Sequence, residues 1–434
     1  MLNTDMMITK KIYPLLLLLL CSRLMVMAQA DTVFNKRPVT YTAFLATVGK
    51  NNLSYSAQKF NIDLAVANIE VVKIFPDPQL AFGYTNLNQG RLAMGYGFNS
   101  SLTGTLELGG KRTARVDLAK SQTELAKYLL ADYFRNLKAD ATLAYLKALQ
   151  NRFLLTVMDS SYAAMNGLAR SDSIRYKLGA ITEVDARQSK VDAVTMLTTL
   201  YQSEADWKTS LVNLSLLMSK TNVDTLYYPV GDFSAFDRDF NLMTLITSAQ
   251  NNRADLLAAL QSKDVSDKML QLAKANRMID LGINLGVNYN AYVHNIMPPT
   301  PSTTPISMGV SIPLKFSNKY AGEYKTAYFT AQQNETLYRQ TELQIQSDVT
   351  QAYYNYLAAR KQVNSFNHGL LNDAKRVLEG KTYSYKRGET TLLDVLTAQR
   401  TYNDVQQGYY QTLYNYAAAL VEVERAAGIW DINL

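Results

Sequence analysis

The chain has 434 residues, of which 19% are charged and 47% hydrophobic, with 29 tyrosines and a formal net charge of +7. The charged fraction lies well below the usual quarter, so an ordinary solvated globule is not expected. Two histidines, one cysteine and no Walker or Gly-x-Ser-x-Gly motif leave few residues for metal, nucleophilic or phosphate chemistry. His294 has no second strong metal ligand nearby in the sequence, and His368 is expected at a helix end. We therefore predict no enzyme, no cofactor and no resident metal ion.

Residues 1–30 have the pattern of a cleaved export signal, with a basic start, an apolar run over residues 15–20 and small residues at 28–30. The alternative is a lipoprotein signal that ends at Cys21, but two leucines stand where such processing needs small residues. Removal of three basic residues and one acidic residue lowers the net charge from +7 to +5 and leaves no cysteine, which excludes disulfides. The remaining positive charge is spread along the chain, so no nucleic-acid partner is expected.

Two regions predict β-hairpins. Apolar residues alternate with small or polar ones from residue 80 to 98, with a continuation over 102–108, and again over 279–289 and 306–314. Segments of about ten residues with one apolar face suit tilted membrane strands. After residue 30 no run of about 18 apolar residues occurs, so no transmembrane helix is expected. The alternative is two soluble hairpins packed on a core.

Three later stretches predict unusually long helices. Residues 111–166 contain neither Gly nor Pro, and 180–228 and 323–368 are similarly free of helix breakers. A helix over the first stretch would be roughly 80 Å long at 1.5 Å per residue, which a globular core cannot cover. Over residues 398–426 two apolar seams lie side by side, so this helix needs a neighbour on each side. Such helices are typical of a cylinder wall.

The chain also repeats itself. Each half reads as helix, β-hairpin, long helix, glycine-marked turn and long helix. We therefore expect a signal peptide (1–30), a first repeat (31–220), an inter-repeat linker (221–241) with small extra structure, and a second repeat (242–434). At a constant offset of 209, the residues Tyr176, Gly179, Thr182 and Asp185 recur as Tyr385, Gly388, Thr391 and Asp394.

The two glycine-marked turns hold the candidate functional residues. Gly179 and Gly388 supply the backbone freedom that a tight reversal between antiparallel helices needs. Thr182 and Thr391 stand where an N-cap hydroxyl would satisfy free N–H groups of the returning helix. The aspartates three residues later fit the acidic preference of a first helical turn. The alternative is that these residues only build the turns.

The duplicated halves, the Tyr-x-x-Gly-x-x-Thr-x-x-Asp turns and the Pro-Asp-Pro-Gln-Leu sequence at 76–80 resemble the TolC-like outer membrane efflux proteins. The resemblance covers essentially the whole chain after the signal. The Leu-Gly-Gly-Lys-Arg sequence at 108–112 is similar to the branch that serves heavy-metal cation pumps of the resistance-nodulation-division class.

The resemblance implies a homotrimer in the bacterial outer membrane, in which four strands per chain form one twelve-stranded β-barrel and long antiparallel helices form a periplasmic tunnel. It implies three kinds of partner besides the other protomers: outer membrane lipid, a periplasmic adaptor (membrane fusion) protein and an inner-membrane resistance-nodulation-division pump. By the same resemblance, Asp394 and Tyr385 are expected to form the periplasmic gate. The adaptor-docking tips become Tyr176, Gly179, Thr182 and Asp185, together with Tyr385, Gly388 and Thr391.

The predicted fold is therefore mostly α-helical with a membrane β-barrel, and the predicted function is the passive outer membrane channel of a tripartite efflux system. The alternative function is a periplasmic coiled-coil adaptor or structural spacer, whose strands would stay in water. The sequence does not identify the exported substrate, because a wide channel discriminates charge and size only coarsely.

Overall fold

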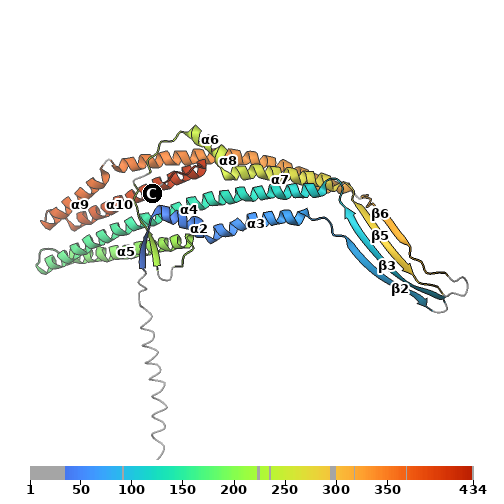
Figure 1. Cartoon of the computed structure of the whole chain (residues 1–434). Coiled ribbons are helices and arrows are strands. Elements are labelled where there is room, and N and C mark those ends of the chain that lie inside the picture. Colours follow the sequence, from blue (N-terminus) through green and yellow to red (C-terminus); the bar gives the residue numbers. More distant parts are fainter. Residues whose placement is uncertain are drawn as a thin grey trace, which may run out of the picture.

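In the computed structural model the described residues are 35–89, 92–221, 225–233, 236–293, 300–316, 318–367 and 369–432. The expected signal peptide with Cys21, both histidines and part of each β-hairpin turn lie outside these ranges. The chain forms an elongated body with a β-sheet at one end and two helical hairpins at the other (Figure 1).

Both halves contain the predicted series of elements. The first half comprises β1 (Asn35–Val39), α2 (Tyr41–Asn51), α3 (Leu53–Lys73), β2 (Gln79–Gln89), β3 (Leu92–Leu106), α4 (Lys111–Lys177) and α5 (Glu183–Leu217). The second half comprises β4 (Thr225–Pro229), α6 (Leu242–Asn252), α7 (Ala254–Asn276), β5 (Leu281–Asn290), β6 (Ile306–Ser311), the 3-10 turn η1 (Asn318–Tyr320), α8 (Ala321–Asn367), α9 (Leu370–Lys386) and α10 (Leu392–Ala427). Among the described helices, none is long and apolar enough to cross a membrane.

The halves differ in their longest helix. α4 continues for 67 residues, past the predicted end at residue 166 and through Gly167, to the tip of the body. In the second half, by contrast, α8 and α9 are separate helices, and Gly369 at the start of α9 has a φ of 102°, in the left-handed region that favours glycine. The breaker-free stretch 180–228 is likewise not one helix. α5 ends at Leu217, and Ser219 has a left-handed φ of 52°.

The four long strands form one antiparallel sheet in the order β2-β3-β5-β6, so the two hairpins pair through β3 and β5. The register aligns Leu80, Leu102, Leu285 and Met308 in one row across the sheet. The next row consists of small or polar residues on the opposite face, namely Ala81, Ser101, Gly286 and Ser307. The predicted separation into an apolar face and a small or polar face is therefore confirmed.

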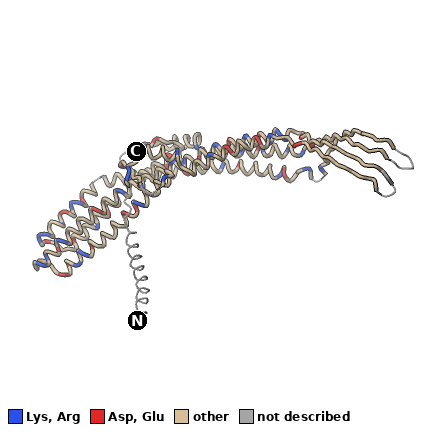
Figure 2. Tube along the Cα trace, turned by 60° about the horizontal axis from the view of Figure 1, so that its bottom comes forward, with Lys and Arg blue, Asp and Glu red and all other residues tan. Residues whose placement is uncertain are grey.

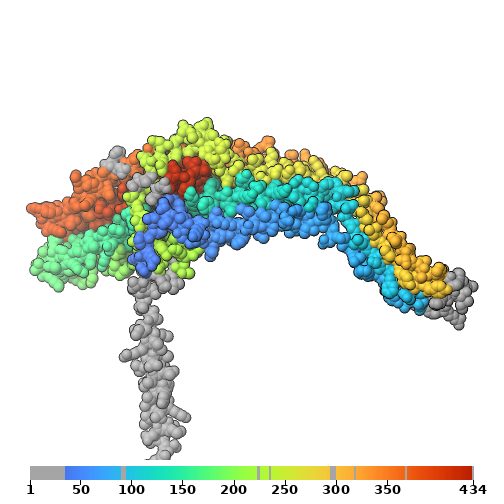
Figure 3. All heavy atoms as spheres, in the orientation of Figure 1, coloured from blue at the N-terminus to red at the C-terminus, as the bar shows by residue number. Residues whose placement is uncertain are grey.

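The apolar face of the sheet is exposed and carries no charge. Phe82 is 78% exposed, and Ile306 at the far edge is 81% exposed. The four strands contain no Asp, Glu, Lys or Arg, and Figure 2 shows the charged residues on the helical part of the body instead. The sheet extends beyond the helices, and the rest of the chain does not cover the face of it that Figure 3 shows.

Two tyrosines fasten the N-terminal strand and the linker to the helices. The segment expected to be the linker contains β4, which pairs in parallel with β1. The hydroxyl of Tyr145 on α4 lies 2.9 Å from the Val39 carbonyl and 2.7 Å from the Val230 carbonyl. On α8, the hydroxyl of Tyr356 lies 3.0 Å from the Arg238 carbonyl and accepts the Arg238 N–H at 2.8 Å. Each repeat thus contributes one buried phenol that satisfies backbone groups of these segments.

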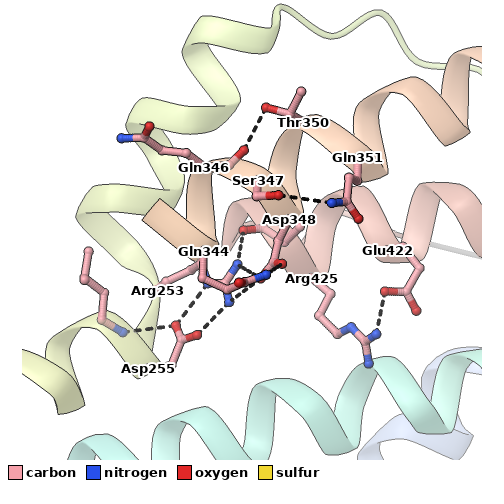
Figure 4. A network of polar contacts seen from close by, with 12 residues as sticks. Arg253, Asp255, Gln344, Gln346, Ser347, Asp348, Thr350, Gln351, Glu422 and Arg425 are labelled. Carbon is pink, nitrogen blue, oxygen red and sulfur yellow. Dashed lines mark hydrogen bonds and ion pairs between the residues drawn. The ribbon is translucent and has the colours of Figure 1, made fainter. Parts of the chain in front are cut away.

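A charged network joins α7, α8 and α10 near the middle of the body. Arg253, which is 6% exposed, donates through Nη2 to Oδ2 of Asp255 at 2.6 Å and lies 3.3 Å from Oδ2 of Asp348 (Figure 4). The same guanidinium donates to the Ala426 carbonyl at 3.2 Å. Because a planar guanidinium has five donors, one side chain can connect three helices in this way.

Glu424 on α10 is fully buried in the central core. Its Oε2 accepts the Asp431 N–H at 3.1 Å, whereas no partner of Oε1 occurs among the described residues. Burial is the main cause that raises the pKa of this carboxyl to about 8. Since the folded state binds this proton more tightly than the unfolded chain, Glu424 lowers the stability as the pH rises from about 4.5 to about 8.

We expect Glu424→Gln to remove most of this pH dependence. Each pKa unit corresponds to about 1.4 kcal/mol, so the loss in the native protein amounts to a few kcal/mol across the interval. Thermal unfolding between pH 5 and pH 9, followed by circular dichroism, measures this pH-dependent loss of stability. The control is Glu124→Gln, which removes an exposed carboxylate. Equal pH dependence of the native protein and the Glu424→Gln variant would contradict the prediction.

Candidate functional site: the tips of the helical hairpins

The two predicted turns form the tips of the α4–α5 and α9–α10 hairpins. Gly179 has a φ of 73° and Gly388 a φ of 80°. The N–H groups of these glycines donate to the carbonyls of Tyr176 at 2.9 Å and Tyr385 at 3.0 Å, respectively. In each turn the next N–H donates to the carbonyl five residues back, which completes a Schellman motif. The glycines therefore close both helices in the conformation that the sequence predicts.

Both threonines cap the returning helices. The Thr182 hydroxyl oxygen accepts the Asp185 N–H at 3.1 Å, and the Thr391 hydroxyl oxygen accepts the Asp394 N–H at 3.3 Å. At the second tip the Asp394 carboxylate also accepts the Thr391 N–H at 3.2 Å, which makes a reciprocal capping box. The predicted capping geometry is present at both tips, and it is more complete at the second.

The Asp394 carboxylate is held in its charged form. It accepts hydrogen bonds from the hydroxyls of Thr390 at 2.6 Å and Thr391 at 2.8 Å, and Lys381 lies 3.4 Å away. These hydrogen bonds, with that from Thr390 the largest, lower the pKa of Asp394 below its ordinary value. Within one chain this carboxylate is therefore negative at every pH near neutrality.

Tyr385 is not an exposed tip residue but a buried connection between the two hairpins. Its hydroxyl donates to Oδ1 of Asp172 on α4 at 3.0 Å, and the two side chains are 5% and 0% exposed. Arg175 lies 3.8 Å from the same carboxylate oxygen and stacks over the Tyr385 ring at 4.7 Å. Burial raises the pKa of Asp172 and raises that of Tyr385 to about 12. The contact connects the first repeat to the second.

Sequence reasoning missed Asp172 and Arg175. Asp172 lies inside an uninterrupted helix with no turn motif around it, so local pattern gives no indication of its partner. The internal repeat did contain a signal, because the residue at offset 209 from Asp172 is Lys381, of opposite charge. A reversal of charge at matching positions indicates that the two repeats have different neighbours there.

The two tips are consequently not equivalent. Tyr176, the counterpart of Tyr385, is 44% exposed. Asp394 has the cation Lys381 beside it. Its counterpart Asp185 instead lies near the buried Asp172 of the α4–α5 hairpin, and repulsion between these two carboxylates contributes to the raised pKa of Asp172. An apolar cluster supports the contact between hairpins, and it comprises Met165, Ala169, Ala193, Tyr385, Leu392, Val395 and Leu396.

Away from the tips, the charged network of Figure 4 borders a cavity of about 470 Å³ between α4, α8 and α10. Its three arginines, Arg135, Arg253 and Arg425, each have a carboxylate within 2.6 Å. Among the described residues, no three His, Cys, Asp or Glu side chains lie together as a metal site. Because its cations are already neutralised, this cavity is not a strong candidate for an anion site.

We expect Tyr385→Phe to loosen the contact between the hairpins, because it leaves the buried Asp172 carboxylate without its phenol donor. Hydrogen exchange of residues 382–392 should then become faster. The matched control is Tyr176→Phe, which removes a hydroxyl from the exposed counterpart at the other tip. Equal exchange in the native protein and the Tyr385→Phe variant would show that the hydrogen bond does not hold the second tip.

Comparison with known proteins agrees with this architecture. Residues 245–429 match the family model described as outer membrane efflux protein. The cobalt-zinc-cadmium resistance protein CzcC of Cupriavidus metallidurans is 23% identical over 419 residues, which cover 92% of this chain and 95% of CzcC.

Solved outer membrane proteins share the fold. The CmeC outer membrane channel of Campylobacter jejuni superposes with a TM-score of 0.75 at 15% identity, covering 89% of this chain and 85% of CmeC. The outer membrane protein VceC of Vibrio cholerae gives a TM-score of 0.69 at 16% identity, covering 89% and 95% of the two chains. Together these matches confirm the resemblance to outer membrane efflux proteins that the motifs indicate, and they agree with the expected outer membrane localisation.

Proposed function

We propose that the chain is one protomer of a homotrimeric outer membrane channel, the exit duct of a tripartite efflux system. The observation that carries this proposal is the exposed, uncharged sheet with two unpaired edges. In hydrocarbon every unsatisfied backbone N–H or C=O group costs several kcal/mol, so an open edge is not tolerated there. Three copies of the four-stranded sheet would close into a barrel of twelve strands, in which β6 of one protomer pairs with β2 of the next.

The helices support the same closure. α3 has no buried residue, and Leu64 on it is 67% exposed. On the other side of the body, Phe329 and Leu343 on α8 are 65% and 67% exposed. Apolar surfaces of this kind on a long helix need a neighbour, and a ring of protomers supplies one on each side. The helices would then surround a tunnel in the periplasm.

The tips are the proposed docking surface for a periplasmic adaptor, which would connect the channel to an inner-membrane pump of the resistance-nodulation-division class. Tyr176 and Leu178 at the first tip are 44% and 77% exposed, whereas Tyr385 is buried. We therefore assign adaptor contact chiefly to the first tip and to the exposed parts of the second. Photo-crosslinking from Tyr176 and Leu178 to a co-expressed adaptor tests this assignment.

Heavy-metal cations are the proposed cargo, on the strength of the relative CzcC, which is named for cobalt, zinc and cadmium resistance. The sequence at 108–112 has a structural role in the single chain. Gly109 and Gly110 both have left-handed φ angles, and Lys111 donates to Asp280 at 2.6 Å. The motif thus builds the corner between sheet and helix. The alternative of a periplasmic adaptor or spacer is disfavoured by the match of residues 245–429 to the outer membrane efflux protein model.

We expect Phe82→Arg and Ile283→Arg to impair assembly, because the proposal places these side chains against lipid. The cost of such a charge is about 2 to 4 kcal/mol near the middle of the bilayer. Asn284→Arg is the matched control, since Asn284 lies on the opposite face and would point into the lumen. Heat-modifiable trimer in outer membrane fractions measures the outcome. Equal amounts of trimer in all three variants would contradict the assignment of faces.

We also propose that Asp394 forms part of a gate at the periplasmic mouth of the trimer, where its carboxylate would attract cations. If three copies converge at the periplasmic mouth, multivalent cations added from that side should block single-channel current in planar bilayers. Asp394→Asn should relieve the block at least tenfold in concentration, while the Thr391 hydroxyl oxygen can still accept the backbone N–H of residue 394 and cap α10. Asp185→Asn, the counterpart at the other tip, should change the block less. A block that persists in Asp394→Asn would leave Asp394 as a capping residue alone.

A further inference from the structure

The connections between the sheet and the helices are unusually basic. Residues 73–78, 107–112, 276–280 and 312–320 contain six Lys or Arg and three Asp or Glu, so six minus three gives +3 of the +7 carried by the whole chain. At the opposite end of the sheet, residues 86–93 and 290–305 contain one Arg and no acidic residue. Positive charge is therefore concentrated at the end where the strands meet the helices.

Some of these cations already have partners. Lys111 pairs with Asp280 at 2.6 Å, and Arg115, just inside α4, makes a two-pronged pair with Glu107. Lys315 donates to the Met278 carbonyl at 2.7 Å and so joins the two ends of the second hairpin. These contacts build the corner between sheet and helix.

Three other cations have no carboxylate partner among the described residues, namely Arg112, Arg277 and Lys319. Arg112 is the best defined of them. Its Nε donates to the Lys73 carbonyl at 2.6 Å, and its guanidinium lies over the Phe75 ring at 4.3 Å. Neither terminal nitrogen of Arg112 has a hydrogen-bond partner within the described ranges, and a guanidinium offers paired donors that match a phosphate.

Exposed aromatic side chains accompany these cations at both edges of the sheet. Phe75, before β2, is 60% exposed, while Phe316 and Tyr320, after β6, are 85% and 42% exposed. Aromatic residues and cations together are typical of the boundary between hydrocarbon and headgroups. We call this set the junction belt, and it comprises Phe75, Arg112, Arg277, Phe316, Lys319 and Tyr320.

We propose that the junction belt binds the phosphate groups of anionic phospholipids in the periplasmic leaflet of the outer membrane. This inference depends on the proposed function, because it requires the sheet to span the membrane up to this level. The cations would contact the phosphate, and the exposed aromatic rings would lie against the upper acyl chains. A free phosphate ion would leave these rings exposed to water, so a lipid fits the surface better.

Trimer closure would assemble each lipid site from two chains. β2 begins and β6 ends at the same end of the sheet, on opposite edges. Pairing of these edges brings Phe75 and Arg112 of one protomer beside Phe316, Lys319 and Tyr320 of the next. Asp77, which is exposed in the same connection, offsets part of the charge, and the site remains cationic. An anionic lipid would thus stabilise the contact between protomers.

The test compares the native trimer with Arg112→Gln/Lys319→Gln in lipid nanodiscs. Native mass spectrometry counts bound phosphatidylglycerol against phosphatidylethanolamine, and the same spectra report lipid A. We expect the native trimer to retain phosphatidylglycerol preferentially, and the affinity to fall roughly fivefold for each cation removed. The control is Lys190→Gln/Lys361→Gln, which removes two exposed lysines from the helical part with the same change in net charge and should keep the preference.

The inference is overturned if the native trimer shows no preference for phosphatidylglycerol, if the control loses as much as the belt variant, or if lipid A is the species retained. Failure of the proposed function looks different, because then no trimer would be recovered from outer membrane fractions. An intact, conducting trimer without lipid preference therefore refutes the belt and leaves the channel unaffected.

Discussion

The hydrogen-bonding requirement of a sheet edge governs the architecture of this chain. Neither hairpin could satisfy its backbone groups alone, and the pairing of β3 with β5 joins the two hairpins into one sheet while leaving an edge on each side. In lipid such edges need partners, which identical protomers would supply in the proposed trimer. The positions of four helices follow, because α3, α4, α7 and α8 meet the sheet at its strand ends.

Much of this could be predicted from the sequence, since it depends on local rules. Alternation of apolar and small residues determined the faces of the strands, and the spacing of Gly179, Thr182 and Asp185 determined a turn with its cap. The buried pair of Tyr385 and Asp172 could not be predicted in this way. Its two members are 213 residues apart, and the helices that carry them have no pattern that sets their angle of contact.

Duplication explains why the halves share elements, and the contacts explain why they have diverged. At the start of α3, Asn52 donates to the Leu217 carbonyl at 2.9 Å. At the matching position of the second half, Arg253 reaches the Ala426 carbonyl and also binds two aspartates. The second half thus has a charged network where the first half has a neutral cap. The difference between Asp172 and Lys381 at matching positions is a parallel case near the tips.

The uninterrupted course of α4 has a consequence for how the chain can vary. A helix of 67 residues is roughly 100 Å long, and each residue turns it by about 100°. Loss of one residue anywhere along it would rotate the whole tip relative to the sheet, whereas loss of seven would restore the orientation to within about 20°. The second half is free of this constraint. Its α8 and α9 are separate helices, so a rotation of one about its axis is not passed on directly to the other. Insertions and deletions in α4 should therefore be confined to lengths near a whole number of turns, such as about 7, 11 or 18 residues, and be less restricted between α8 and α9.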